Sequence, residues 1–239
     1  MKRVRNFFPD SFFLYFYSMK KFFAAFAIFF FAFTASGQDA AMSSWPYLYP
    51  EFSKGTVWMS DGKKYEKDLN VHLAKGRLHF VDGNAIKEAN PGEIVLVELN
   101  GDQFTSLNGD IVKVIGDIER GYVAKKTSVD FQKLNETDGP YGTKIDAGAT
   151  LSLTTLELTG DASSYPELLR NRNEGSSLPL KNDYYIVTGG KVLNASKKAV
   201  ENSLDAEGKA AFKTFQKQNK IKWQDTASLL QLVDFLTGL

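Results

Sequence analysis

A regular series of glycine-containing pairs punctuates residues 54–126 of this chain. Asn-Gly and Asp-Gly suit a two-residue hairpin turn, whose central positions need positive φ. Apolar and polar residues alternate between the pairs, as they do in strands with one buried face. The stretch therefore predicts about eight short antiparallel strands. The pairs are Asp61-Gly62, Lys75-Gly76, Asp82-Gly83, Asn100-Gly101, Asn108-Gly109 and Arg120-Gly121.

The C-terminal part has a helical pattern instead. Ser196, Asp205 and Asp225 each stand where an N-cap begins a helix. The first two helices should reach about Leu204 and about Asn219. The last one repeats apolar residues at helical spacing. The fold class predicted is mainly β with C-terminal helices (α+β). It is an antiparallel β-meander that forms a barrel or a strongly curved sheet, covered by about three short helices.

The first 37 residues have the layout of an export signal. Residues 19–37 join a positive start, Met19-Lys20-Lys21, to an apolar run at residues 22–33 and a small-residue cleavage site that ends at Gly37. This is typical of a secretory signal peptide, with Gln38 as the first mature residue. Met19 is then the expected initiator, and residues 1–18 precede the true start. A retained anchor helix is the alternative, since residues 12–17 lengthen the apolar segment. We expect a periplasmic or secreted protein after cleavage.

Cysteine content and charge limit the class of partner. The sequence contains no cysteine, so no disulfide and no lipid-modified cysteine is available. Beyond residue 37 there are 24 basic and 27 acidic residues, a net charge of −3. This balance disfavours a nucleic-acid partner. We expect an envelope protein or a small ligand as partner, no transmembrane segment in the mature chain, and no cofactor.

Residues 38–53 form an extended segment that we name the strap. Pro46 and Pro50 keep it out of a helix. Its four aromatic rings either pack against the sheet or form an exposed surface that docks on a partner. The rings, which are the candidate partner-binding residues, are Trp45, Tyr47, Tyr49 and Phe52.

The register of the first hairpins follows from their turns. A two-residue turn at Asp61-Gly62 sets Trp58 opposite Tyr65 and Thr56 opposite Lys67. A two-residue turn at Lys75-Gly76 pairs Leu73 with Leu78 and Val71 with Phe80, which keeps all four apolar side chains on one face.

That second register sets His72 directly opposite His79 on the less apolar face. These are the only histidines in the chain. Cross-strand neighbours have Cβ atoms about 5 Å apart, so the two imidazoles and Asp68 are candidate metal ligands. The alternative is a solvated histidine pair, and in that case His72→Ala should barely alter stability.

The remaining meander is expected to end at residue 158. The strand from Glu93 to Leu99 is apolar on both faces and should be central in the sheet. The Asn100-Gly101 turn sets Val97 against Phe104. Residues 139–144 read as a loop and residues 147–158 as another strand. Residues 159–181 are expected to form a surface loop with one turn of helix at Pro166–Arg170. Residues 182–239 comprise a last hairpin around Gly189-Gly190 and the helical part.

The sequence lacks the common catalytic signatures. It has no cysteine nucleophile, no G-x-S-x-G elbow and no zinc-protease or calcium-loop motif. No catalytic or cofactor-binding residue is predicted. A pair of carboxylates would be needed for a glycoside hydrolase. The candidates for such a pair are Asp68, Glu98, Asp102 and Asp130.

The order of segments, Gly37-Gln38, then Tyr49-Pro50-Glu51-Phe52, a glycine-punctuated meander and a three-helix tail, resembles uncharacterised secreted proteins of Bacteroidota with no assigned function. The resemblance implies location and broad architecture, and no functional residue. We therefore expect an exported, non-enzymatic binding or structural module of the bacterial envelope. The alternatives are an envelope glycan hydrolase with paired carboxylates and a barrel that carries a small apolar ligand.

Overall fold

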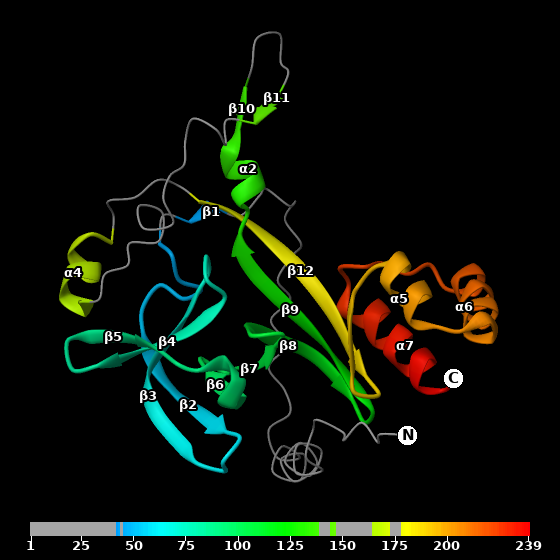
Figure 1. Ribbon diagram of the computed structural model, residues 1–239, viewed down its shortest axis with the longest axis horizontal. Helices are drawn as coiled ribbons and strands as arrows, with labels where there is room; N and C mark the ends of the chain where they lie inside the picture. The colour runs from blue at the N-terminus through cyan, green and yellow to red at the C-terminus, as the bar shows by residue number, and fades with distance from the viewer. Residues whose placement is uncertain (1–41, 44, 139–143, 147–163, 173–177) are drawn as a thin grey trace, which may run out of the picture.

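The computed structural model describes residues 42–43, 45–138, 144–146, 164–172 and 178–239. The expected start and signal peptide, residues 1–37, and the expected strand at 147–158 lie outside this range, as does most of the loop expected at 139–144. Within it, antiparallel strands build one large sheet, and helices cover part of that sheet (Figure 1). This confirms the predicted class, mainly β with C-terminal helices.

The eleven-stranded sheet has the order β1-β12-β9-β8-β7-β6-β2-β3-β4-β5, with β13 paired to β12. A separate two-stranded sheet joins β10 and β11. The strands are β1 Met42–Ser43, β2 Ser53–Met59, β3 Lys64–His72, β4 Arg77–Asp82, β5 Ala85–Glu88, β6 Ile94–Leu99, β7 Asp102–Leu107, β8 Asp110–Ile118, β9 Gly121–Val129, β10 Glu136–Asp138, β11 Lys144–Asp146, β12 Leu178–Thr188 and β13 Lys191–Asn194. The helices are α2 Phe131–Asn135, α4 Tyr165–Arg170, α5 Lys197–Ser203, α6 Ala206–Gln218 and α7 Thr226–Thr237, with a 3₁₀ turn at Pro91–Glu93.

Among the described strands, the sheet is curved and not closed into a barrel. The loop between β3 and β4 nevertheless reaches β8 and β9, which are distant in the strand order. The backbone N–H of Ile111 donates to the carbonyl of Gly76 at 2.8 Å, and that of Val129 donates to Leu73 at 3.4 Å. The inner face of this curve buries an apolar cluster between β2, β3, β4, β6, β7 and β8.

Helices α5, α6 and α7 pack against one end of the sheet, beside β8, β9 and β12 (Figure 1). Ser196, Asp205 and Asp225 cap them as predicted, each accepting a backbone hydrogen bond from the third residue on. Two glycines allow α7 to approach the sheet closely. A Cβ on Gly121 would lie 2.7 Å from a methyl carbon of Val233, and one on Gly116 would lie 2.8 Å from Thr226. Within the described part of the chain, no helix has the length and apolar content needed to cross a membrane.

Several turns are as predicted. Asn100 and Gly101 have φ of 53° and 81°, and Val97 pairs with Phe104. The strand Ile94–Leu99 is buried on both faces and lies between β2 and β7, inside the strand order. The last hairpin turns at Gly189-Gly190, but β12 begins at Leu178. The expected loop 159–181 is therefore wrong at its C-terminal end, because residues 178–181 already pair with β1 and β9.

The first hairpin differs from the prediction by one residue. Trp58 pairs with Lys64, not with Tyr65, because the loop has three residues, Ser60 to Gly62. The N–H of Met59 donates to the carbonyl of Lys63 at 2.9 Å, which closes this loop. A slip of one residue moves side chains to the other face. Trp58 accordingly stacks with the ammonium group of Lys64, 5.5 Å from the ring centre.

The second hairpin differs by two residues. Val71 pairs with Leu78, and His72 pairs with Arg77, because the connection is the four-residue loop Leu73 to Gly76. Leu73 leaves the ladder and is buried against Val129 and Leu178. A shift of two residues keeps every side chain on its face, so burial of one face does not distinguish the two registers.

Candidate ligand-binding site

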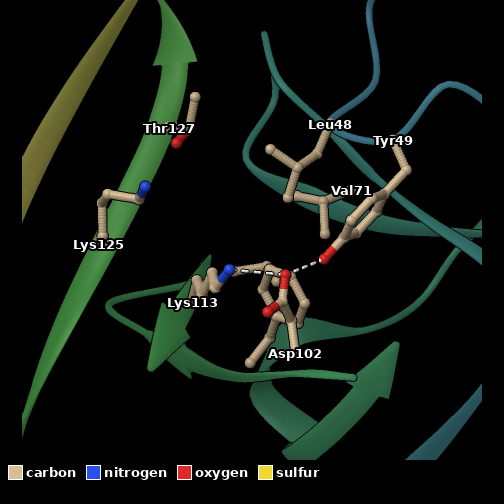
Figure 2. Close-up of a pocket in the computed structure, with 9 residues that line it drawn as sticks. Leu48, Tyr49, Val71, Asp102, Lys113, Lys125 and Thr127 are labelled. Atoms are coloured by element: carbon tan, nitrogen blue, oxygen red, sulfur yellow. Dashed lines mark hydrogen bonds and ion pairs between the residues drawn. The ribbon is translucent and has the colours of Figure 1, made fainter. Parts of the chain in front are cut away.

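The candidate site is a cavity of about 190 Å³ on the inner face of the curved sheet. The strap forms one wall and strands β7, β8 and β9 form the opposite one, with Lys125 and Thr127 extending toward the strap (Figure 2). One part of the lining is apolar and the other carries charged and hydroxyl groups. We name it the strap cavity; its residues are Leu48, Tyr49, Val71, Asp102, Phe104, Ile111, Lys113, Lys125 and Thr127.

Strand register places three of these residues in one cross-strand row. Phe104 pairs with Lys113, and Lys113 pairs with Lys125. The second pairing depends on a bulge, because the register between β8 and β9 shifts between Val114 and Gly116. Without that shift Lys113 would face Lys126 on the next strand. The bulge therefore places both cavity lysines on the inner face, and bulges are frequent beside functional sites because they redirect side chains.

Asp102 joins the strap to β8. The hydroxyl of Tyr49 donates to its Oδ2 at 2.5 Å, and the ammonium group of Lys113 lies 2.7 Å from the same oxygen (Figure 2). Burial favours a raised pKa for Asp102, but the hydrogen bonds from Lys113 and Tyr49 and the charges of Lys113 and Lys125 outweigh it and hold the pKa below its usual value. Burial and the bond to Asp102 raise the pKa of Tyr49. At neutral pH the carboxylate is therefore ionised and the phenol is neutral.

Lys125 is the charged group of the cavity without a carboxylate partner. Among the described residues, no acidic side chain lies within ion-pair distance of its ammonium group, whereas the adjacent Lys126 contacts Asp110 at 2.6 Å. Burial and the nearby charge of Lys113 lower the pKa of Lys125, with partial compensation from Asp102. Like charges directly opposite each other on neighbouring strands are destabilising. Lys113 and Lys125 together form an electropositive wall that Asp102 neutralises only in part.

Asn70 fixes the strap wall. Its side chain is fully buried and makes four hydrogen bonds to backbone groups. The amide oxygen accepts from the N–H of Tyr49 at 3.1 Å and of Val71 at 2.9 Å, and the amide nitrogen donates to the carbonyls of Tyr49 at 2.8 Å and Glu51 at 3.0 Å. The ring of Tyr49 is therefore held where its hydroxyl reaches Asp102.

The histidine pair is buried, and the expectation of a solvated pair is wrong. His72 and His79 are 1% and 6% exposed, because Tyr47 of the strap covers their face of the sheet. They do not pair directly, since His79 lies opposite Asn70, but their ring centres are 4.9 Å apart on one face. The hydroxyl of Tyr47 contacts Nδ1 of His79 at 3.0 Å.

The third candidate metal ligand, Asp68, has a different partner. Asp68 forms an ion pair with Lys54 at 2.9 Å at the surface. Within the described ranges, no group of three His, Cys, Asp or Glu side chains is arranged to hold a metal ion.

The candidate partner-binding rings mostly belong to the core. Trp45, Tyr47 and Phe52 are 7%, 4% and 8% exposed and pack with Leu168 of α4. The strap thus buries its rings, and these three do not form the exposed docking surface considered as the alternative. Tyr49, the fourth ring, is the one that reaches the strap cavity.

Of the four carboxylates considered for hydrolysis, Asp102 alone lines the strap cavity. Asp68 is paired with Lys54, and Asp130 accepts a hydrogen bond from the N–H of Lys133 at the start of α2. Glu98 lies opposite Gln103 in the ladder, on the face of β6 away from Val97. The structure does not bring a second of these residues to Asp102.

Lys113, Lys125 and Asn70 were not predicted as functional residues. One signal in the sequence concerns Lys113, because the Asn108-Gly109 turn fixes where it lies on β8. The place of Lys125 opposite it depends on the register between β8 and β9. The bulge that completes the pairing has no comparable signal.

Comparison with known proteins gives no assignment. No protein-family model, no curated protein and no solved structure matches this chain.

Proposed function

We propose that the protein is a non-enzymatic binding module that holds a small anionic ligand in the strap cavity. The observation that carries the proposal is Lys125, a half-buried lysine on the cavity wall that faces Lys113 and has no carboxylate at ion-pair distance in the described part of the chain. A buried charge is normally paired. A bound anion would supply the missing partner.

The shape of the site supports binding of a ligand and does not favour the alternatives. The lining combines an apolar wall with a few converging polar groups, as ligand pockets do. Glycoside hydrolysis needs two facing carboxylates, and Asp102 is the one carboxylate among the described lining residues. A carrier of a purely apolar ligand would leave Lys125 unpaired.

We also propose that the module is exported and acts in the bacterial envelope. The support is the sequence of residues 19–37, with its positive start, apolar run and small-residue cleavage site. Intact mass of the protein recovered from the envelope fraction tests this part. A mass that begins at Gln38 is expected, and a membrane-bound chain that retains residues 19–37 would contradict it.

Backbone amide NMR of the isotopically labelled protein tests anion binding. Titration with acetate, benzoate or phosphate at constant ionic strength should shift the amides of Lys113, Lys125 and Thr127 for at least one of these anions. Sodium chloride at the same ionic strength is the control. The proposal fails if every anion produces the same small shifts as chloride.

Lys125→Met is the variant expected to lose anion binding, and Lys126→Met is its matched control. Lys126 is the next residue on β9, faces the other side of the strand and has its own partner in Asp110. The first variant should lose the anion-dependent shifts, and the second should keep them.

A further inference from the structure

The chemistry of the strap cavity narrows the ligand to one class. This inference rests on the proposed function, because it identifies the anion that the same site would bind. Three properties of the cavity define it: the net charge of its polar wall, the nature of its apolar wall, and its volume.

Counted over the residues that the structure describes, the polar wall carries one uncompensated positive charge. Lys113 and Lys125 contribute two ammonium groups, and the ionised Asp102, 2.7 Å from Lys113, neutralises one. A monoanion would complete the balance. A dianion such as HPO4²⁻ would leave a net negative charge beside the carboxylate of Asp102, in a partly buried site where charge imbalance is unfavourable.

The donors available to this anion come from both lysines. An ammonium group has three N–H donors, and Asp102 is the acceptor recorded for Lys113. Lys113 and Lys125 lie directly opposite each other on adjacent strands, so their ammonium groups can approach the two oxygens of one carboxylate. The hydroxyl of Thr127 already donates to the side-chain oxygen of Asn182 at 2.7 Å.

The rest of the lining is built from hydrocarbon. Leu48 of the strap, Val71 of β3, Phe104 of β7 and Ile111 of β8 face the cavity there. Val71, Phe104 and Ile111 belong to the main apolar cluster of the inner face. A fully hydrated inorganic anion would gain nothing from this wall, whereas an apolar body attached to the anionic group would bury its surface against it.

The volume of the cavity indicates the size of the body that fits inside it. The cavity measures about 190 Å³. A dry apolar cavity of roughly 150 Å³ accommodates one benzene molecule. The strap cavity thus has room for one six-membered ring, or a branched chain of similar size, together with a carboxylate.

We propose that the ligand of the strap cavity is a small aromatic or branched-chain monocarboxylate, with its carboxylate between Lys113 and Lys125 and its apolar body against Phe104 and Ile111. Benzoate has the required size and charge. For a molecule of this size, the dissociation constant expected is between about 10 µM and 1 mM.

The test compares probes that share either the ring or the charge. Isothermal titration of the full chain is carried out with benzoate, with benzamide and benzyl alcohol, which keep the ring without the charge, with acetate, which keeps the charge without the ring, and with inorganic phosphate. We expect benzoate to bind at least about tenfold more tightly than each of the others, a ratio that a charge-assisted hydrogen bond or the burial of one ring can supply.

Variants locate the binding. Lys125→Met should weaken benzoate at least about tenfold, Lys125→Arg should retain part of the affinity because the charge remains, and the control Lys126→Met should bind as the unmodified chain does. Thermal unfolding checks that each variant is folded. The comparison of probes on the unmodified chain decides the proposal even if a variant does not fold.

The outcomes separate this inference from the proposed function. Tighter binding of phosphate than of benzoate, lost in Lys125→Met, would overturn the monocarboxylate inference and leave anion binding intact. Equal binding of benzamide and benzoate would overturn it as well, because the charge would not be recognised. Binding of none of the anions would overturn both proposals.

Discussion

Replacement of Asn70 by alanine should loosen the strap and destabilise the whole fold. Asn70 is 0% exposed, and its amide makes four hydrogen bonds to the backbone of residues 49, 51 and 71. Alanine removes all four and leaves buried N–H and C=O groups without this partner. Each such bond contributes about 0.5–1.5 kcal/mol net, so the loss is about 2–6 kcal/mol. This is a large part of the stability of a typical domain, about 5–15 kcal/mol.

Urea unfolding followed by tryptophan fluorescence measures this loss, because Trp45 lies in the strap and donates its indole N–H to the carbonyl of Tyr49 at 2.8 Å. Asn182→Ala is the matched control. Asn182 is exposed on β12 and accepts one hydrogen bond, from the hydroxyl of Thr127. Its replacement should therefore change the free energy of unfolding by no more than about 0.5 kcal/mol. If Asn70→Ala lowers the free energy of unfolding by less than about 1 kcal/mol, the role given to these hydrogen bonds is refuted.

Asn70→Asp sharpens the same test. It keeps the shape and the acceptor oxygen but turns the donor nitrogen into an oxygen that faces the carbonyls of Tyr49 and Glu51. Burial and these carbonyls should raise the pKa of the new carboxyl in the folded state. Stability should therefore fall as pH rises through that pKa, and the variant should be closer to the unmodified chain in acid than at neutral pH. A variant equally destabilised at both would contradict the argument.

The remaining predictions concern other positions. Lys125→Met should stabilise the chain by roughly 0.5–1 kcal/mol at neutral pH, since it removes a like-charge pair. This gain should shrink as pH rises from the lowered pKa of Lys125 toward the ordinary lysine value, because Lys125 in the unmodified folded chain then loses its charge. Thermal unfolding at several pH values measures both effects. Gly121→Ala should cost about 1–3 kcal/mol in urea unfolding, because the added Cβ would lie 2.5 Å from the carbonyl oxygen of Val187 on β12 and 2.7 Å from a methyl carbon of Val233 on α7. A neutral result would mean that β12 and α7 do not pack this closely against Gly121. His72→Ala should lower the unfolding free energy by about 2–3 kcal/mol, because this ring is buried and accepts a bond from the N–H of Lys75; a change under about 0.5 kcal/mol would restore the solvated interpretation.

The turns show what the sequence can predict. Asn100-Gly101 and Asn108-Gly109 form two-residue turns, with positive φ at all four residues, because the Asn-Gly pair favours this turn locally. Asp61-Gly62 and Lys75-Gly76 also place a glycine at positive φ, but in loops of three and four residues. Glycine supplies the required φ in all of these loops, so its presence locates a turn without fixing its length.

The histidines show that alternation of apolar and polar residues along a strand does not define which side chains are exposed to solvent. Asn70, His72 and His79 lie on the less apolar face of β3 and β4, and a two-layer pattern would leave them in water. Tyr47 and the rest of the strap cover this face, with α4 packed outside. The covering segment comes before the meander in the sequence and pairs with the end of β3. Two of the polar residues beneath it, Asn70 and His79, hydrogen-bond to it. Side-chain pattern within a strand contains no information about such a cover.

The strap cavity could not be predicted because it depends on contacts between distant segments. Asp102 approaches Tyr49 across the curved sheet, 53 residues apart in sequence. Lys113 faces Lys125 because of the bulge near Gly116, and a regular ladder continued from the turn at the end of β8 would have set Lys113 against Lys126. The charge composition and the alternation of β9 are the same in both registers.

The energetic position of Lys125 is itself an argument for a ligand. An interior-facing row that begins with Val97 and Phe104 continues with two lysines, where apolar residues would extend the core. Asp102 neutralises one of them, and the second lies half-buried with a lowered pKa. For stability alone, methionine would be the better residue at 125. If Lys125→Met proves more stable and also fails to bind the anion, the residue is retained for binding at the expense of stability. If it proves less stable, Lys125 has a structural role and the argument for the ligand loses its main support.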